Sequence, residues 1–371
     1  MKPFASAFVA AMLPIALHAQ QVTTILDAAT QVDDALFRDA DGYLYGSHYM
    51  GSNVYRLAPD GAVATFISGL DTPNGIAMNS AGEFYVADNT GDRILHVAHD
   101  GSPIDTFAVT NPSGLLKAWD SDTILFTQYL PGKMGKLAPD GVISTTHEGL
   151  PLNGPVGLAY TEDGTLYVAN YTDRRIHRVT TSGLEYVARV PGPSNGVLGF
   201  ITAAGNRLYG TSWNNNAIYT IEPMTVDSVR LVAGGNGPGN TDGDASVARF
   251  NQPNGILAVA GGDTLYVSDF GSKNIRMITG VLTGIQVRDR DEQLRVGPNP
   301  VREVVRVHAD EPWPAGTRCE VIDAQGRMAH QRTELVPVQH ISVDVRDLAP
   351  GAYVVRLISP GRSASAHIVV E

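Results

Sequence analysis

The stretch Glu83-Phe84-Tyr85-Val86-Ala87 decides the fold, because five variants of it recur along the chain. Each variant places a large apolar residue between small, apolar or β-branched neighbours. The middle residues are Tyr45, Tyr85, Leu125, Tyr167, Tyr209 and Tyr266, which gives spacings of 40, 40, 42, 42 and 57 residues. A period near 40 built from strand-like segments is typical of propeller blades rather than of helical solenoids.

Every repeat has the same internal order of strand and turn signals. In the second repeat, residues 74–78, 83–87, 93–97 and 104–107 predict four short strands, with Gly, Asp and Asn between them. A four-stranded sheet cannot cover both of its own apolar faces, so such sheets stack around a ring. The sequence therefore predicts an all-β chain: a six-bladed β-propeller over 20–289, followed by a small C-terminal β-sandwich over 290–371.

Two segments compete for the strand that closes the ring. Residues 22–26 (Val-Thr-Thr-Ile-Leu) precede the first repeat and have no blade of their own. We predict that they form the outermost strand of the last blade, which fastens the last blade to the first. Residues 281–287 are the alternative.

A Gly-rich insertion, residues 233–244, lengthens the last repeat. Asn240, Asp242 and Asp244 superficially follow the start of a calcium loop. Ala245 stands where that loop needs glycine, and Asn251 where it needs a bidentate glutamate. The pattern favours a surface loop over a calcium site.

The last repeat also carries a family resemblance. Residues 248–256 (Ala-Arg-Phe-Asn-Gln-Pro-Asn-Gly-Ile), with Gly234-Gly235 before them and residues 265–269 and 274–276 after, resemble the NHL repeat. Residues 73–98 and 154–179 are shorter versions. The resemblance covers about 32–280 and implies a six-bladed propeller, an architecture shared with the gluconolactonase/regucalcin group.

The first 19 residues have the pattern of a secretory signal peptide. Lys2 is followed by an apolar run from Phe4 to Leu17, and Ala19 precedes the expected cleavage point. The run is too short to span a bilayer, and Pro14 disfavours a buried helix as the alternative. No other stretch predicts a transmembrane segment.

The C-terminal 82 residues differ in character from the repeats. They contain ten Arg and no Lys, and they break the 40-residue rhythm. Three motifs, Gly297-Pro298-Asn299-Pro300, residues 319–327 and residues 348–357, together resemble the C-terminal sorting domain of the type IX secretion system. That resemblance implies secretion or display at the cell surface with the type IX machinery as a partner; an ordinary accessory sandwich is the alternative.

The net charge and the cysteine content of the chain limit the classes of ligand and structural module that it is expected to have. The chain has 371 residues, a net charge of −11 and a single cysteine, Cys319, which excludes an internal disulfide and Cys-rich zinc modules. Residues 20–289 hold 16 Lys and Arg against 27 Asp and Glu. This acidity argues against a nucleic-acid partner and favours cationic or neutral ligands over anionic ones, although it also serves solubility.

Two circles of residues are expected near the channel at the centre of the ring. The first is the position of Asn74 in each repeat, which aligns Asp34, Asn74, Ser113 or Gly114, Val156, Leu198 and Asn254. The resemblance to gluconolactonases implies a divalent metal such as calcium, held by Asp34, Asn74 and Asn254. Val156 and Leu198 stand where that site needs oxygen, so the alternative is that the Asn and Asp residues cap turns.

The second circle lies four residues beyond each repeat's central position: Tyr49, Asn89, Tyr129, Tyr171, Trp213 and Phe270. Five of the six are aromatic, although aromatic residues form only 7% of the chain. Packing between blades is one explanation. The other is an aromatic platform that binds a sugar, a peptide or a small amphipathic molecule.

Chemistry has few visible candidates. The sequence has no HExxH zinc motif and no G-x-S-x-G elbow. We therefore expect a non-catalytic recognition module, with Tyr49, Tyr129, Tyr171, Trp213, Phe270, Asn74 and Asn254 at the ligand and no required cofactor. A metal-dependent lactonase or esterase is the alternative, and a structural surface protein is a third possibility.

Overall fold

The computed structural model describes residues 20–27, 31–259, 262–281, 294–313, 315–323, 328–359 and 362–371. The predicted signal peptide and residues 282–287 of the alternative closing segment lie outside these ranges. The described residues form strands and turns and no helix, which confirms the all-β prediction. They fall into two compact units, one containing β1 to β25 and the other β26 to β32.

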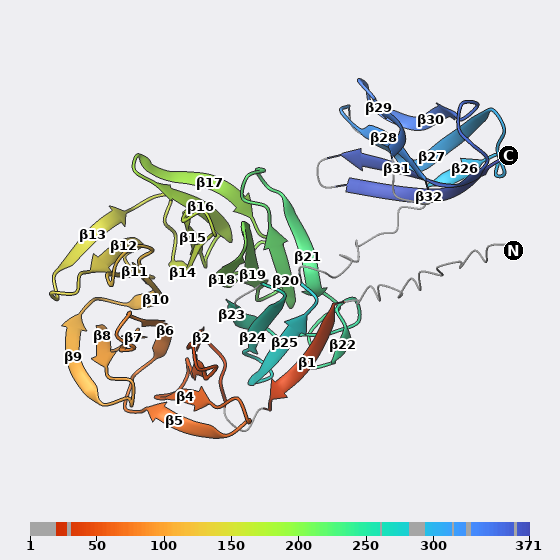
Figure 1. Ribbon diagram of the computed structural model, residues 1–371. Coiled ribbons are helices and arrows are strands. Elements are labelled where there is room, and N and C mark those ends of the chain that lie inside the picture. Colours follow the sequence, from red (N-terminus) through yellow and green to blue (C-terminus); the bar gives the residue numbers. More distant parts are fainter. Residues whose placement is uncertain are drawn as a thin grey trace, which may run out of the picture. The chain divides into compact units, whose positions relative to one another are not determined.

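The described residues of the first unit form six sheets around a ring, as Figure 1 shows. Five are consecutive antiparallel meanders of four strands: β2 (Leu36–Arg38), β3 (Leu44–Ser47), β4 (Val54–Leu57) and β5 (Val63–Ile67); β6 (Pro73–Met78), β7 (Phe84–Asp88), β8 (Arg93–Val97) and β9 (Pro103–Ala108); β10 (Pro112–Lys117), β11 (Ile124–Gln128), β12 (Lys133–Leu137) and β13 (Ile143–Glu148); β14 (Pro155–Tyr160), β15 (Leu166–Asn170), β16 (Arg175–Thr180) and β17 (Gly183–Arg189); β18 (Leu198–Ala204), β19 (Arg207–Ser212), β20 (Ala217–Ile221) and β21 (Val229–Gly234). The sixth has the order β22 (Gly243–Asp244), β1 (Gln21–Leu26), β25 (Asn274–Thr279), β24 (Thr264–Asp269) and β23 (Pro253–Ala258).

The repeated tyrosines pack between neighbouring sheets. Tyr45, Tyr167 and Tyr209 are at most 1% exposed. The Tyr45 ring lies 4.5 Å from Phe84 of the next sheet and 4.9 Å from Phe66, and its hydroxyl donates to Asp39. Burying an aromatic ring between two sheets removes a large apolar area from water, so the repeated residue holds the ring together.

Strand β1 joins the last sheet and closes the ring, as predicted, but it is not the outermost strand of that sheet. It pairs antiparallel with β25, so residues 21–26 lie beside residues 275–279, and the two-residue strand β22 adds to its other edge. Asp242 accepts hydrogen bonds from the backbone and hydroxyl of Thr24, and it also binds Arg276, whose side chain is fully buried. The predicted surface loop 233–244 is therefore the clamp that fixes β1 to β25.

The innermost strands approach one another so closely that a glycine is required there. A Cβ on Gly255 would lie 2.0 Å from the carbonyl oxygen of Asp34, and one on Gly75 would lie 2.3 Å from that of Ser113. Hydroxyls fasten the same contacts: Ser268 Oγ donates to the Asp34 carbonyl at 2.6 Å. This contact fixes the backbone of Asp34. In most sheets the residue that faces the channel comes directly before the glycine of the close approach.

The second unit contains two antiparallel sheets. One has the order β26 (Arg295–Gly297), β27 (Val304–Trp313) and β30 (Val338–Asp344); the other has the order β29 (Met328–Thr333), β28 (Arg318–Asp323), β31 (Gly351–Ser359) and β32 (Arg362–Val370). Trp313 and Cys319 are buried in one apolar core with valines of both sheets. Nothing in the described part of the chain is a helix long and apolar enough to cross a membrane.

Candidate functional site

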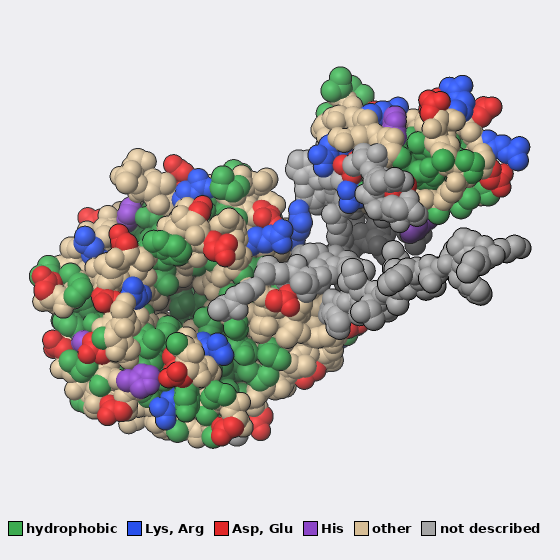
Figure 2. Space-filling view, in the orientation of Figure 1, with side chains coloured by type: hydrophobic (Ala, Val, Ile, Leu, Met, Phe, Trp, Pro, Cys, Tyr) green, Lys and Arg blue, Asp and Glu red, His purple; other side chains and the backbone are tan. Residues whose placement is uncertain are grey.

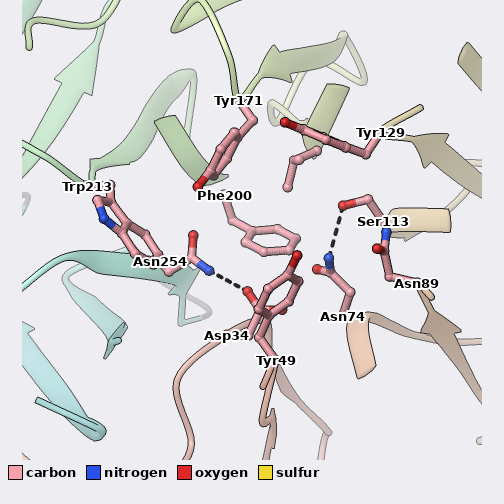
Figure 3. Close-up of a pocket in the computed structure, with 11 residues that line it drawn as sticks. Asp34, Tyr49, Asn74, Asn89, Ser113, Tyr129, Tyr171, Phe200, Trp213 and Asn254 are labelled. Atoms are coloured by element: carbon pink, nitrogen blue, oxygen red, sulfur yellow. Dashed lines mark hydrogen bonds between the residues drawn. The ribbon is translucent and has the colours of Figure 1, made fainter. Parts of the chain in front are cut away.

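The centre of the ring contains a pocket of about 190 Å³ built from all six sheets. Each sheet contributes one residue from the start of its innermost strand, and five sheets contribute a second from the turn that follows their second strand. Figure 3 shows these side chains converging on one centre. The lining residues are Asp34, Tyr49, Asn74, Asn89, Ser113, Tyr129, Val156, Tyr171, Phe200, Trp213 and Asn254.

The first predicted circle is present at five of its six positions. Asp34, Asn74, Ser113, Val156 and Asn254 line the pocket. The placement of Leu198 was wrong, because its side chain is fully buried in the core and Phe200 lines the pocket instead. Figure 3 shows the Phe200 ring near the middle of the pocket, among the other lining side chains.

Phe200 reaches the pocket because the order of residues around the close approach differs in β18. In most sheets the pocket residue comes directly before the tight glycine, as in Asn74-Gly75 and Asn254-Gly255. In β18 the residue against the next sheet is Gly199, where a Cβ would lie 2.4 Å from the Asn254 carbonyl oxygen. The pocket residue comes after it. Gly199 marks the close approach in the sequence and could have located the pocket residue. The sequence prediction instead took the residue before this glycine, Leu198, and missed Phe200 after it.

The polar side of the pocket has two internal hydrogen bonds. Asn254 Nδ2 donates to Asp34 Oδ1 at 2.5 Å, and Asn74 Nδ2 donates to Ser113 Oγ at 3.2 Å (Figure 3). Asp34 Oδ2 and Asn74 Oδ1 are buried and have no hydrogen-bond partner among the described residues. Two acceptor oxygens are thus left for a guest molecule or water.

Burial dominates the electrostatics of Asp34. It raises the pKa of this carboxyl well above the ordinary value, and the neighbouring charge of Asp33 raises the pKa further. Asp33 has its own cation, Lys273, with Nζ 2.7 Å from its Oδ2. Among the described ion pairs none includes Asp34, so no cation of the described residues compensates its charge.

The second predicted circle forms the aromatic side. Tyr49, Tyr129, Tyr171 and Trp213 line the pocket. The rings of Tyr129 and Tyr171 meet edge to face, with centroids 5.8 Å apart. Burial, followed by the nearby Tyr129, Tyr49 and Asp34, raises the pKa of Tyr171 to about 12, so this phenol stays protonated at physiological pH.

The other two members of that circle have different surroundings. Phe270 is not among the lining residues. Its ring packs on Trp213, with centroids 4.4 Å apart, and Lys273 Nζ lies over the Phe270 ring, 4.8 Å from its centroid. Asn89 lines the pocket, yet its amide donates to the Pro112 carbonyl and its Oδ1 accepts from Asn111. Phe270 supports Trp213, and Asn89 holds the neighbouring loop.

The pocket residues do not fit a resident divalent cation. Calcium takes six to eight oxygen ligands, and catalytic zinc takes three nitrogen, sulfur or carboxylate ligands. Asp34 is the one carboxyl in the lining, and Val156 and Phe200 occupy two of the six innermost positions. No group of three or more His, Cys, Asp or Glu side chains suited to a metal occurs in the described ranges. We therefore assign no step to a metal.

Comparison with known proteins places this pocket in a family context. The family model described as the virginiamycin B lyase family matches residues 12–238, more than half of the chain. A virginiamycin B lyase from Nocardia farcinica is 31% identical over 146 residues, which is 39% of this chain and 51% of that protein. The match thus spans about half the length of that curated relative.

Solved structures show the same fold at low identity. An auxiliary nutrient binding protein from Bacteroides thetaiotaomicron has a TM-score of 0.58 at 18% identity, covering 70% of this chain and 76% of that one. A gluconolactonase from Xanthomonas campestris has a TM-score of 0.55 at 17% identity, covering 71% and 90%. These neighbours confirm the β-propeller fold, while the NHL-repeat resemblance stays a prediction.

The second unit also has a family match. The model described as the secretion system C-terminal sorting domain matches residues 295–371, which confirms the type IX sorting tail and supports secretion or display at the cell surface. The family match over 12–238 covers most of the first unit, which contains the pocket. The chain belongs to the virginiamycin B lyase family and carries a secretion sorting domain at its C-terminal end.

Proposed function

We propose that the protein is an exported binding module that recognises a small amphipathic group in the central pocket of its propeller. The observation that carries the proposal is that the pocket combines aromatic side chains with two buried oxygens, Asp34 Oδ2 and Asn74 Oδ1, that have no hydrogen-bond partner among the described residues. Concave, largely apolar sites with a few convergent polar groups are typical of small-molecule recognition.

The size of the pocket limits what enters it. Drug-sized ligands occupy pockets of about 300–1,000 Å³, whereas this pocket measures about 190 Å³. A single ring or short chain fits, and a larger ligand would insert one end. The apolar side chains next to two lining tyrosines, Met50 and Leu130, are 72% and 64% exposed, so the rest of an amphipathic ligand has apolar surface to contact.

Isothermal titration calorimetry tests the proposal, because it measures binding equally well in a variant that lacks Trp213. Wild-type protein is titrated with a panel of small aromatic amines, alcohols and acids, sugars and short peptides, and Trp213→Leu is expected to lose binding by at least tenfold. Trp119→Leu is the matched control, because Trp119 is 58% exposed and does not line the pocket. Equal affinity of wild type and Trp213→Leu for every saturable ligand would dismiss the pocket as the binding site.

Family membership favours a second candidate, a lyase that acts on a virginiamycin B-type substrate. Asp34 is the one carboxyl in the pocket that could move a proton during such a reaction. Incubation with virginiamycin B, followed by mass spectrometry, separates the two functions. Time-dependent conversion that is lost in Asp34→Asn supports the lyase, while an unchanged substrate supports the binding module.

The metal-dependent lactonase or esterase remains the third candidate. The low-identity gluconolactonase neighbour shows its fold alone, and the pocket lacks the oxygen ligands described above. Calcium or zinc that raises the melting temperature of wild type, but not of Asp34→Asn, would support it. We expect neither ion to change the melting temperature.

A further inference from the structure

The pocket combines two features that select the same kind of guest. Four aromatic side chains, Tyr49, Tyr129, Tyr171 and Trp213, line the pocket from four different sheets, and Phe200 lines it as well. Aromatic faces carry negative potential and attract cations that come within about 6 Å of the ring. Such an arrangement therefore favours a positively charged group with an apolar body over a neutral or anionic one.

Hydrogen bonding on the other side makes the same selection. Asp34 and Asn74 are 1% and 6% exposed, and Asp34 Oδ2 and Asn74 Oδ1 lack partners among the described residues. Asn74 Oδ1 is an acceptor, because the Asn74 amide nitrogen donates to Ser113. Asp34 Oδ2 is an acceptor when this carboxyl is ionised, since Asn254 Nδ2 already donates to Asp34 Oδ1. A guest must therefore donate hydrogen bonds to complete the site.

Charge completes the argument. Burying a carboxyl without a cation is unfavourable, and the described ion pairs give Lys273 to Asp33 and none to Asp34. Burial raises the pKa of Asp34 for that reason, with Asp33 adding to the effect. A guest cation beside Asp34 would compensate the carboxylate, as Lys273 does for Asp33.

We propose that the pocket binds a primary or secondary alkylammonium group, with its N–H groups donating to Asp34 Oδ2 and Asn74 Oδ1 and its apolar part against the tyrosines and Trp213. The inference rests on the proposed binding function and specifies its ligand class. It also fits the excess of acidic residues in 20–289, which attracts cations to this unit.

Calorimetry with shape-matched probes tests the inference on the wild-type protein. Phenethylammonium is compared with 2-phenylethanol, 3-phenylpropionate and phenethyltrimethylammonium. The primary amine is expected to bind at least tenfold more tightly than the alcohol, because a charged hydrogen bond contributes more than a neutral one. The trimethylated cation should be weaker than the primary amine, since it has no N–H to donate.

Variants assign the effect to the two acceptors. Asp34→Asn should weaken phenethylammonium at least tenfold and leave 2-phenylethanol within about twofold. Asp41→Asn, the same charge change at an exposed position outside the lining, should change neither. Asn74→Leu provides a second test if Asp34→Asn does not fold, as judged by circular dichroism.

The outcomes separate the two proposals. An alcohol or acid that binds as tightly as the amine overturns the alkylammonium inference and leaves the binding function standing. Absence of saturable amine binding also overturns the inference, while any other panel ligand lost in Trp213→Leu preserves the binding function. An amine preference that Asp34→Asn and Asn74→Leu both leave unchanged would equally overturn it.

Discussion

Asp34 lies in an environment very different from that of a free side chain, because it is buried and has the charge of Asp33 beside it. Its folded-state pKa is raised above the unfolded value, about 3.9, so the folded protein binds this proton more tightly. The corresponding stability is fully present below the unfolded pKa and is lost as pH rises through the raised folded pKa. Ligand-free protein should therefore become less stable with rising pH at this site.

The Asp34→Asn variant isolates that contribution. Relative to wild type, its melting temperature should gain as pH rises from about 4 to 8, because the variant has no proton to lose at this position. Differential scanning fluorimetry across that range, with the exposed Asp41→Asn as control, measures the difference. Wild-type and Asp34→Asn curves that stay parallel over the whole range would contradict the assigned pKa shift.

Phe200 sets the size of the pocket. Phe200→Ala should lower the free energy of unfolding by about 2 kcal/mol, less than the 3–5 typical of a fully buried phenylalanine, because Phe200 faces the pocket on one side. It should also shift preference toward larger rings, measured as naphthylethylammonium against phenethylammonium. The half-buried Phe270→Ala, outside the lining, should cost a similar stability without changing that preference. Unchanged ring preference in Phe200→Ala would show that this side chain does not limit the pocket.

Leu198 and Phe200 show how far sequence reasoning reaches at this scale. Repeat spacing placed Asp34, Asn74, Val156 and Asn254 on one circle, and the last three come directly before a glycine that closely approaches the next sheet. Spacing alone could not show that in β18 the glycine comes before the pocket residue instead of after it. Gly199 makes the close approach to the next sheet, and Phe200 follows it. Phe270 matches the spacing of the lining tyrosines, but its packing on Trp213 depends on tertiary contacts.

Among the elements, the segment that fixes strand β1 to β25 depends on buried charged side chains, Arg276 and Asp269. Arg276 is fully buried, donates to the carbonyls of Arg249 and Thr241, and lies 2.6 Å from Asp242 and 3.8 Å from the buried Asp269. Burial raises the pKa of Asp269 to about 7 despite this cation. The insertion that appeared from the sequence to be a surface loop therefore depends on one guanidinium.

Arg276→Met should lower the free energy of unfolding by about 3–5 kcal/mol, because Asp269 is left buried without its cation. The stability difference between wild type and Arg276→Met should grow between pH 5 and pH 8. In the variant, Asp269 must either stay protonated as pH rises or be buried as a charge without a cation. Urea unfolding at both pH values measures it. Asp269→Asn added to Arg276→Met should recover part of the loss, and a double variant no more stable than Arg276→Met would rule out Asp269 as the cause.

At the scale of the whole molecule, the central pocket and the sorting-domain match lie in different units. The pocket residues lie between 34 and 254, and the sorting-domain match covers 295–371. Removing residues 295–371 should abolish delivery to the cell surface while the cell still makes the protein. Immunoblots of culture medium, surface and cell fractions check this, with full-length Asp34→Asn as an exported control. A truncated chain found at the surface in normal amounts would refute the role of the tail.

Closing the ring by its first strand has a consequence for synthesis. Thr24 pairs with Arg276, so about 250 residues separate partners that lie side by side. At ribosomal elongation rates of about 5–20 residues per second, β1 waits roughly 13–50 s for β25 to be made. During that interval its backbone groups have no permanent partner, and a nascent chain from a neighbouring ribosome could take the place of β25. The last sheet is thus where newly made copies of this protein are most exposed to pairing with each other.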